Sequence, residues 1–173
     1  MKIKRLLKIF IIFIALALPV VILIYAASKK EDVLKSKHNR KTFTLHDLKL
    51  FKKDGSLYPL NDLDADKNTV LILFSPDCDM CREELKNIAD HFDQFEQKNV
   101  FFIGPNNQET YDFLTNKPYE LLKKKNVKMV HDKEGILFKD LKIRSTPAIL
   151  VFDQTTKIKK IYEGVHPLDS LQL

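Results

Sequence analysis

Short apolar runs recur along the C-terminal two-thirds of the chain, and residues that favour turns separate them. Their lengths of four to six residues fit β-strands. We predict strands at residues 70–74, 100–103, 127–130, 148–152 and 157–162. The last two flank a four-residue turn at 153–156 and predict a terminal hairpin.

The segments between these runs carry apolar residues at helical spacing. Leu85, Ile88, Phe92 and Phe95 step by three, four and three positions, which predicts one helix over residues 78–97. Further helical segments are predicted at 108–114, at 119–125 after Pro118, and at 134–141. Strands that alternate with helices predict an α/β domain.

The region before the first buried strand predicts an added β-hairpin. Apolar residues at 43–50 nearly alternate with polar ones, and residues 57–60 supply a return strand. The Asp-Gly pair at 54–55 between them is a dipeptide that closes hairpins.

The N-terminus predicts a membrane anchor. Residues 9–27 are nineteen positions without a charge, preceded by four basic residues. Spanning a bilayer takes roughly 20 residues, whereas the apolar part of a cleaved signal peptide is usually about 7–15. Cleavage near Ala27-Ser28 is the alternative. We expect a cytoplasmic tip and transmembrane helix at residues 1–28, a linker at 29–41 and one domain at 42–173.

The net charge of +6 comes from this N-terminal segment. Residues 1–30 hold six basic residues and no acid, which leaves 23 basic and 23 acidic residues in the remainder. A neutral domain argues against a nucleic-acid surface, and the lysines at 123–125 are interpreted as the solvated end of a helix.

Both cysteines lie in one motif, where the apolar run 70–74 gives way to a helix start. Unpaired N–H groups and the positive end of the helix dipole stabilise a thiolate at Cys78, the predicted nucleophile. Cys81 lies one turn further on the same face and can close a disulfide with it. A redox pair fits an oxidising compartment, so we expect the domain on the periplasmic side of a bacterial cytoplasmic membrane.

Two structural interpretations of the motif are weaker. Structural zinc needs four ligands, and the chain has no second cysteine pair and no paired histidine spacing, so no metal is expected. A purely structural disulfide between neighbouring turns would stabilise little, because cross-link stabilisation grows with loop length.

Several motifs, taken in chain order, carry a resemblance. They are residues 43–45, the strand 70–74, the cysteine pair, Ser145-Thr146-Pro147 before the strand 148–152, and residues 162–164. This order resembles the thioredoxin superfamily, and the anchor and added hairpin are most similar to TlpA/ResA-like periplasmic thiol-disulfide oxidoreductases. The resemblance implies a thioredoxin-like fold, with a central mixed sheet flanked by helices.

The resemblance also implies roles for three further residues. Pro147 matches a cis-proline that faces the disulfide, and it leaves the backbone at Thr146 free to pair with a substrate chain. Glu84 matches an acid near the active site that tunes or shuttles the proton of Cys81. The alternatives are a trans proline that opens a strand and an exposed helix glutamate beside Glu83.

By the same resemblance, the partners are a protein disulfide as substrate and a membrane thiol transporter of the DsbD or CcdA kind as electron donor. An apocytochrome c cysteine pair would be one such substrate, and no cofactor is implied. The expected reaction is reduction of a partner disulfide by Cys78, with Cys81 resolving the mixed disulfide.

The chain departs from the family pattern in several places. It has no tryptophan, and Phe74 occupies the approach to the first cysteine. The dipeptide between the cysteines is Asp79-Met80, and Ile72 stands where thioredoxins carry a buried acid. Little sequence follows residue 164, so the usual C-terminal helix is truncated or absent. These departures favour a narrow partner over general reductase activity.

Charge bears on the direction of electron flow. Asp77 and Asp79 flank Cys78 and oppose thiolate formation, whereas the helix start favours it. Because strong oxidants of this fold depend on a very stable thiolate, the flanking acids predict a reducing couple.

Three other functions remain open. Ser75, three residues before Cys78, is the position where a peroxiredoxin-type peroxidase wants a hydroxyl. A copper chaperone of the Sco type would need a longer cysteine spacing and a partner for His131. A non-catalytic binding module on the same fold is the third.

Overall fold

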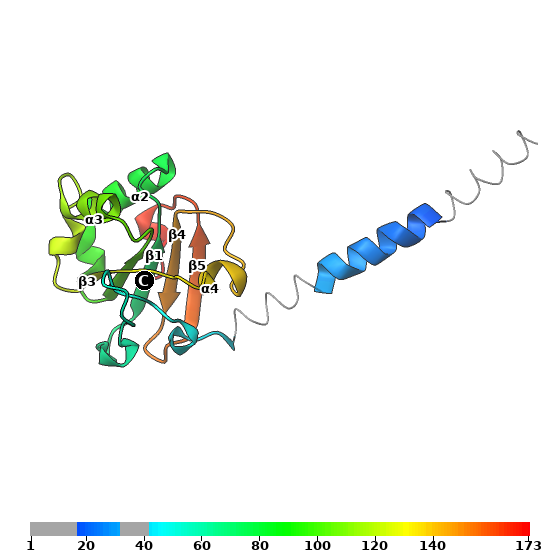
Figure 1. Ribbon diagram of the computed structural model, residues 1–173, viewed down its shortest axis with the longest axis horizontal. Helices are drawn as coiled ribbons and strands as arrows, with labels where there is room; N and C mark the ends of the chain where they lie inside the picture. Colours follow the sequence, from blue (N-terminus) through cyan, green and yellow to red (C-terminus); the bar gives the residue numbers. More distant parts are fainter. Residues whose placement is uncertain (1–16, 32–41) are drawn as a thin grey trace, which may run out of the picture. The chain divides into compact units, whose positions relative to one another are not determined.

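The structure is a computed structural model that describes residues 17–31 and 42–173. Residues 17–31 form one helix, so residues 29–31, expected in the linker, continue it (Figure 1). The first part of the predicted anchor, residues 9–16, lies outside the described residues, as do residues 32–41 of the linker. None of the helices in the described ranges has the length and apolar character that crossing a bilayer requires.

A five-stranded mixed sheet forms the centre of the domain, as the sequence predicts (Figure 1). Its strands are β1 Thr69–Leu73, β2 Asn99–Ile103, β3 Val127–Val130, β4 Ala148–Phe152 and β5 Ile158–Glu163, in the order β3-β2-β1-β4-β5. The strands β1, β2 and β3 are parallel to one another. β4 runs antiparallel to both β1 and β5. The central position of β1 explains why its residues are all buried.

The helices are α2 Asp79–Asp90, α3 Gln108–Thr115 and α4 Ile136–Lys139. The helix predicted over 78–97 is broken at His91, whose φ of −123° and ψ of 38° are not helical. A 3-10 helix, Phe92–Phe95, follows the break and buries both of its phenylalanines. The apolar spacing therefore predicted the buried face correctly but did not reveal the break.

The helix predicted at 119–125 is wrong in extent, since only the 3-10 turn Leu121–Lys123 forms there. Glu120 before it has a φ of 48°, in the left-handed region, and the Lys117–Pro118 peptide bond is cis. An α-helix needs negative φ throughout, so it cannot pass through Glu120.

Alternating residues of β1 divide the core into two layers. Val70, Ile72 and Phe74 face a cluster that α2 and α3 cover, whereas Leu71 and Leu73 face a second cluster. The second cluster takes Leu137 of α4 and the apolar residues of the segment 43–50. Figure 1 shows α2 and α3 on one side of the sheet and α4 on the other.

The predicted N-terminal hairpin is reduced to one bridge, between Phe51 and Leu57. Phe43, Leu45, Leu48 and Leu50 are all buried, but the 3-10 turn Leu45–Asp47 interrupts the alternation that a continuous strand would need. Asp47 Oδ2 accepts hydrogen bonds from the backbone N and the hydroxyl of Thr44, the N-cap residue of the 3-10 turn Leu45–Asp47. The expected turn does close, through a hydrogen bond from Lys52 N to Ser56 O.

No α-helix forms within residues 164–173, as the short C-terminus predicts. The 3-10 turn Leu168–Ser170 lies in this segment. Leu168 and Leu171 are buried in the same cluster as α2. The end of the chain therefore packs on the helix that carries the cysteines.

Candidate active site

Cys78 occupies the N-cap position of α2. The chain leaves β1 at Phe74 and turns, with Cys78 N donating to Ser75 O at 3.2 Å. Cys78 then adopts extended dihedral angles, and its Sγ accepts a hydrogen bond from Cys81 N at 3.2 Å. The sulfur therefore takes the place of a capping oxygen and satisfies one unpaired N–H of the first turn. This N–H and the helix dipole favour a negative charge on Sγ.

Cys81 lies on the buried face of α2 and has no exposed surface, whereas Cys78 is half-buried. Burial, followed by the hydrogen bond with Cys78, raises the pKa of the Cys81 thiol to about 11. Cys81 is therefore protonated near neutral pH, and both thiols are free in this structure. The burial difference leaves Cys78, the predicted nucleophile, as the accessible thiol and Cys81 as the protected one.

The loop before β4 reaches the same sulfur. Cys78 Sγ donates to Thr146 O across 3.7 Å, and the Thr146–Pro147 peptide bond is cis, as the resemblance implies. The pairing of Leu73 with Ala148 explains this contact, because the end of β1 and the start of β4 lie side by side. The sequence alternative of a trans proline is wrong.

Glu84 is fully buried on the same face of α2, one turn beyond Cys81, so the alternative of an exposed glutamate is wrong. Its Oε2 accepts a hydrogen bond from the backbone N of His166 at 3.3 Å, and its Oε1 has no partner. Burial raises the pKa of Glu84, although the hydrogen bond and charge of His166 oppose the rise. Ile72 of β1 is buried in the adjoining cluster, so the buried acid comes from the helix and not from the central strand.

Arg82 and His166 belong to the site but were not predicted. Arg82 Nε donates to Pro76 O at 2.8 Å and stabilises the turn that precedes Cys78. An arginine directly after the second cysteine was a possible signal for this contact. No sequence signal could have found His166, because it contributes its backbone N–H across 82 positions of sequence.

Aromatic rings support the base of the turn. Phe74 is buried, with its ring edge-on to Phe102 at 5.9 Å and stacked with Phe113 at 6.1 Å between centroids. Gly104 at the end of β2 lies beneath it, where an added Cβ would approach the ring to 3.0 Å. Phe74 thus fills the approach to Cys78.

His131 directly follows β3 and is buried. Its Nδ1 lies 2.8 Å from Gly104 O and its Nε2 lies 2.8 Å from the Tyr111 hydroxyl. A carbonyl only accepts, so Nδ1 carries the proton, and in the neutral ring the Tyr111 hydroxyl donates to Nε2. In residues 17–31 and 42–173, no three metal-ligating side chains gather into a candidate ion site.

Fold and site together define a class of protein, an α/β domain of thioredoxin type with a dithiol at the start of a helix. The chain belongs to the AhpC/TSA family, whose model matches residues 39–161. It is accordingly a thiol-disulfide oxidoreductase of the thioredoxin superfamily. No curated protein matches the chain in sequence.

Solved structures support the fold. StoA from Bacillus subtilis is 18% identical with a TM-score of 0.50, over 70% of this chain and 90% of that one. A secreted Mycobacterium tuberculosis disulfide oxidoreductase homologous to Escherichia coli DsbE is 16% identical with a TM-score of 0.54, over 75% and 91%. The exposed lipoprotein thioredoxin Etrx1 of Streptococcus pneumoniae is 21% identical with a TM-score of 0.50, over 71% and 93%.

Proposed function

We propose that this protein is a membrane-anchored, extracytoplasmic reductase of the TlpA/ResA type that reduces disulfides in a specific partner protein. The observation that carries the proposal is the contact of Cys78 Sγ with Thr146 O at 3.7 Å, beside a cis peptide bond. A substrate strand that pairs with the backbone at Thr146 brings its own sulfur to Cys78. The fully buried Cys81 is protected for the second step.

The reaction balances as a two-electron exchange. The Cys78 thiolate attacks one sulfur of the substrate disulfide, which forms a mixed disulfide and releases the other sulfur as a thiolate. Cys81 loses its proton and attacks Cys78, which forms the Cys78–Cys81 disulfide and releases the second substrate thiol. The substrate gains two electrons and two protons, and the enzyme is oxidised.

Glu84 has the position to take the proton of Cys81, because both side chains lie on the buried face of α2. Its raised pKa keeps the carboxyl closer to neutrality than that of an exposed glutamate. Its partnerless Oε1 is free to accept the proton.

Turnover requires an electron donor, for which we propose a membrane thiol transporter of the DsbD or CcdA kind, and the substrate is a protein such as an apocytochrome c. The uncharged stretch at 9–27 and its basic flank support the anchor. Alkaline phosphatase fused after Leu173 should be active and should sediment with membranes. An inactive fusion would contradict the exported location.

The direction of the reaction is tested by the reduction potential of the full chain in thiol buffers. Asp77 and Asp79 are both exposed beside Cys78 and support a reducing couple. We expect a value near or below about −250 mV. A value near about −120 mV would make the protein an oxidant that forms disulfides.

A peroxidase activity is not favoured. Ser75 bonds to Cys78 through its backbone carbonyl, and the Cys78 sulfur faces the backbone carbonyl of Thr146, a group suited to a peptide. Hydrogen peroxide consumption that survives Cys81→Ser would favour the peroxidase instead. A Cys78→Ser protein that keeps its role in the cell would favour the non-catalytic binding module.

A further inference from the structure

Exposed apolar side chains flank the redox site. Within residues 42–173, the large apolar side chains with substantial exposure are Leu57, Met80, Phe138 and Val165. Met80 is 50% exposed and Val165 is 36% exposed, and each is next to a residue of the site. Single exposed apolar residues are ordinary, but neighbouring ones around a reactive group indicate a binding surface.

The backbone contacts of its neighbours fix the place of Val165. Gly164 N donates to Pro147 O at 2.8 Å, and His166 N donates to Glu84 Oε2 at 3.3 Å. Val165 therefore lies between the cis-proline loop and α2. It borders Thr146, the residue at which a substrate strand pairs.

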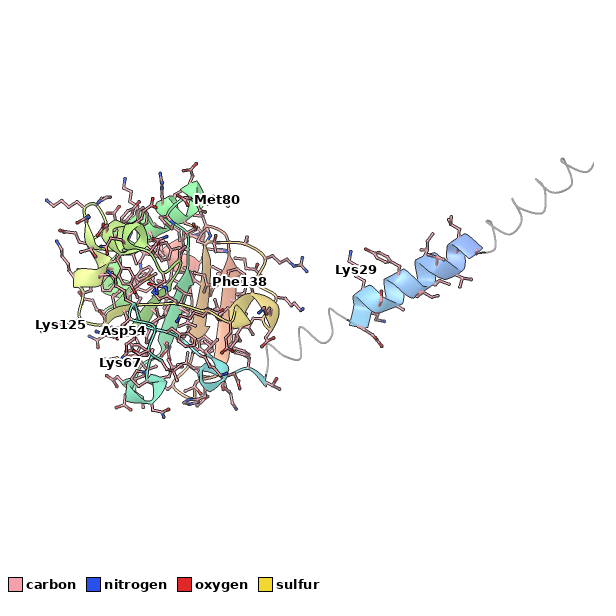
Figure 2. The ribbon with its side chains drawn as sticks, in the orientation of Figure 1. Lys29, Asp54, Lys67, Met80, Lys125 and Phe138 are labelled. Atoms are coloured by element: carbon pink, nitrogen blue, oxygen red, sulfur yellow. The ribbon has the colours of Figure 1, made fainter. Side chains whose placement is uncertain are left out.

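Met80 lies on the other side of the reactive sulfur. It is the second residue of α2, between the two cysteines, and Figure 2 shows it at the outer end of that helix. Cys78 Sγ contacts Thr146 O, and Met80 and Val165 flank this contact along the chain on α2 and beside the cis-proline loop. We call Met80, Cys78, Thr146 and Val165 the redox rim.

The charged residues that directly flank Cys78 are both acidic. Asp77 and Asp79 are exposed, and neither forms an ion pair in the part of the chain that the structure describes. The nearby basic residue Arg82 directs its Nε to Pro76 O. Arg144 precedes Thr146 by two positions, and its backbone N donates to Glu163 Oε2 at 2.8 Å.

We propose that the redox rim selects its substrate by sequence: a cysteine with an apolar neighbour, which packs on Met80 and Val165, and a basic residue on the α2 side, which pairs with Asp77 and Asp79. The inference rests on the proposed function and specifies its substrate class. Apolar contact supplies affinity, and the acids supply orientation and rate of encounter.

The test measures kcat/KM of the full chain for peptide disulfides that differ only beside the cysteine. One peptide carries Leu and Lys, a second Leu and Ser, and a third Ser and Glu. Because no electron donor is present, kcat/KM is measured in a single turnover, as the second-order rate constant with which the pre-reduced chain is oxidised by each peptide. We expect the first to be reduced at least about tenfold faster than the third, which corresponds to 1.4 kcal/mol. The advantage over the second peptide should shrink between about 0.05 M and about 0.5 M salt.

Variants of the rim residues test whether the redox rim causes the preference among the peptides. Met80→Ser and Val165→Ser should each lower the ratio of kcat/KM between the Leu–Ser and Ser–Glu peptides about threefold or more. Phe138→Ser is the matched control, since Phe138 is exposed on α4 and lies apart from Met80 in Figure 2. The ratio of kcat/KM between the Leu–Ser and Ser–Glu peptides should be the same in Phe138→Ser as in the wild type.

The outcomes separate the inference from the proposed function. Equal rates for the three peptides would contradict substrate selection by the redox rim. Equal ratios of kcat/KM in Met80→Ser, Phe138→Ser and the wild type would contradict it as well. Neither result would affect the proposed reductase activity. Failure of the wild type to reduce any of the peptides, or glutathione disulfide, would overturn the proposed function itself.

Discussion

At the scale of single residues, Glu84 carries the least compensated polar group of the site. One carboxylate oxygen bonds to a backbone N–H and the other has no partner, although the side chain has no exposed surface. An ionised carboxylate in such a place is costly, and this is why its pKa is raised. The protein retains an acid where a leucine would pack with less cost, which is consistent with a role in proton transfer.

The raised pKa of Glu84 predicts the sign of a pH effect. The folded state holds this proton more tightly than the unfolded state, so the contribution to stability is complete below the usual pKa of 4.5. It is lost as the pH rises through the folded pKa. Glu84→Gln removes the titration, so its unfolding free energy relative to the wild type should increase as the pH rises from 4.5 to 7.

Urea unfolding of the reduced proteins at several pH values checks this difference. Glu83→Gln is the matched control, because Glu83 is the exposed neighbour of Glu84 on the same helix. A Glu84→Gln difference that stays constant with pH would show that burial does not perturb this carboxyl.

His131 predicts a pH effect of the opposite sign. Burial lowers its pKa, so the unfolded state binds the proton more readily than the folded state. Its contribution to stability is complete above the usual value of 6.5 and is lost as the pH falls through the folded pKa. His131→Gln should abolish this loss of stability between about pH 6.5 and pH 5, whereas the exposed His91→Gln should retain it.

At the scale of elements, the ends of β1, β2 and β3 meet at one edge of the sheet through Phe74, Gly104 and His131. Tyr111 of α3 joins them, and Lys53 of the N-terminal turn lies 4.5 Å from the centre of its ring. The turn that replaces the predicted hairpin therefore packs on the edge that carries the active site.

The close packing around Gly104 predicts the cost of adding a methyl group at this position. A methyl group in Gly104→Ala would lie 3.0 Å from Phe74 Cε1 and 3.1 Å from Phe74 O. The backbone oxygen cannot rotate away, so we expect a loss of about 1–3 kcal/mol in unfolding free energy. Phe74→Leu relieves only the ring contact, so adding it should rescue the variant in part. Full additivity of the two changes in a double-mutant cycle would contradict the contact.

Sequence patterns predicted elements where burial has a clear period. The strands β1 and β4 and the helix α3 lie within one residue of expectation, because continuous apolar runs and a regular amphipathic face are local signals. Breaks were missed at His91 and Glu120, where single dihedral angles end the helix. The hairpin was overpredicted, because the step of three residues from Leu45 to Leu48 holds a 3-10 turn and not a continuous strand.

At the scale of the whole molecule, the end of the chain closes over the redox helix. Leu168 and Leu171 are buried in the cluster that also holds Cys81, Leu85 and Ile88 of α2. Gln172 N also donates to the Tyr162 hydroxyl at 2.9 Å and holds the segment to β5. Two residues of the C-terminal segment, Leu168 and Leu171, are therefore part of the core, although the segment forms no α-helix.

This packing predicts the cost of one truncation. Leu168 is 5% exposed, so Leu168→Ala should lower the unfolding free energy by about 2–5 kcal/mol. Leu57→Ala makes the same chemical change at a side chain that is 56% exposed and should cost less than about 0.5 kcal/mol. Denaturant midpoints of the two variants give the comparison, and similar midpoints would mean that the segment contributes little.

The site was predictable only where the sequence brings its members together. Cys78, Cys81 and Glu84 lie within two turns of one helix, and Thr146-Pro147 came from the resemblance. The burial of Glu84, the backbone N–H of His166 and the neighbourhood of Val165 depend on how the chain returns from β5 to α2. Contacts between segments so far apart in sequence are set by the whole fold and leave no local pattern.

Because Cys81 is buried, the rate at which its thiol reacts measures local opening of the protein. An alkylating reagent can reach Cys78 in the native state, but it can reach Cys81 only when α2 lifts from its cluster. The rate at which a second label is incorporated therefore measures how often this region opens. A labelling time course followed by mass spectrometry would give the free energy of this local opening of α2.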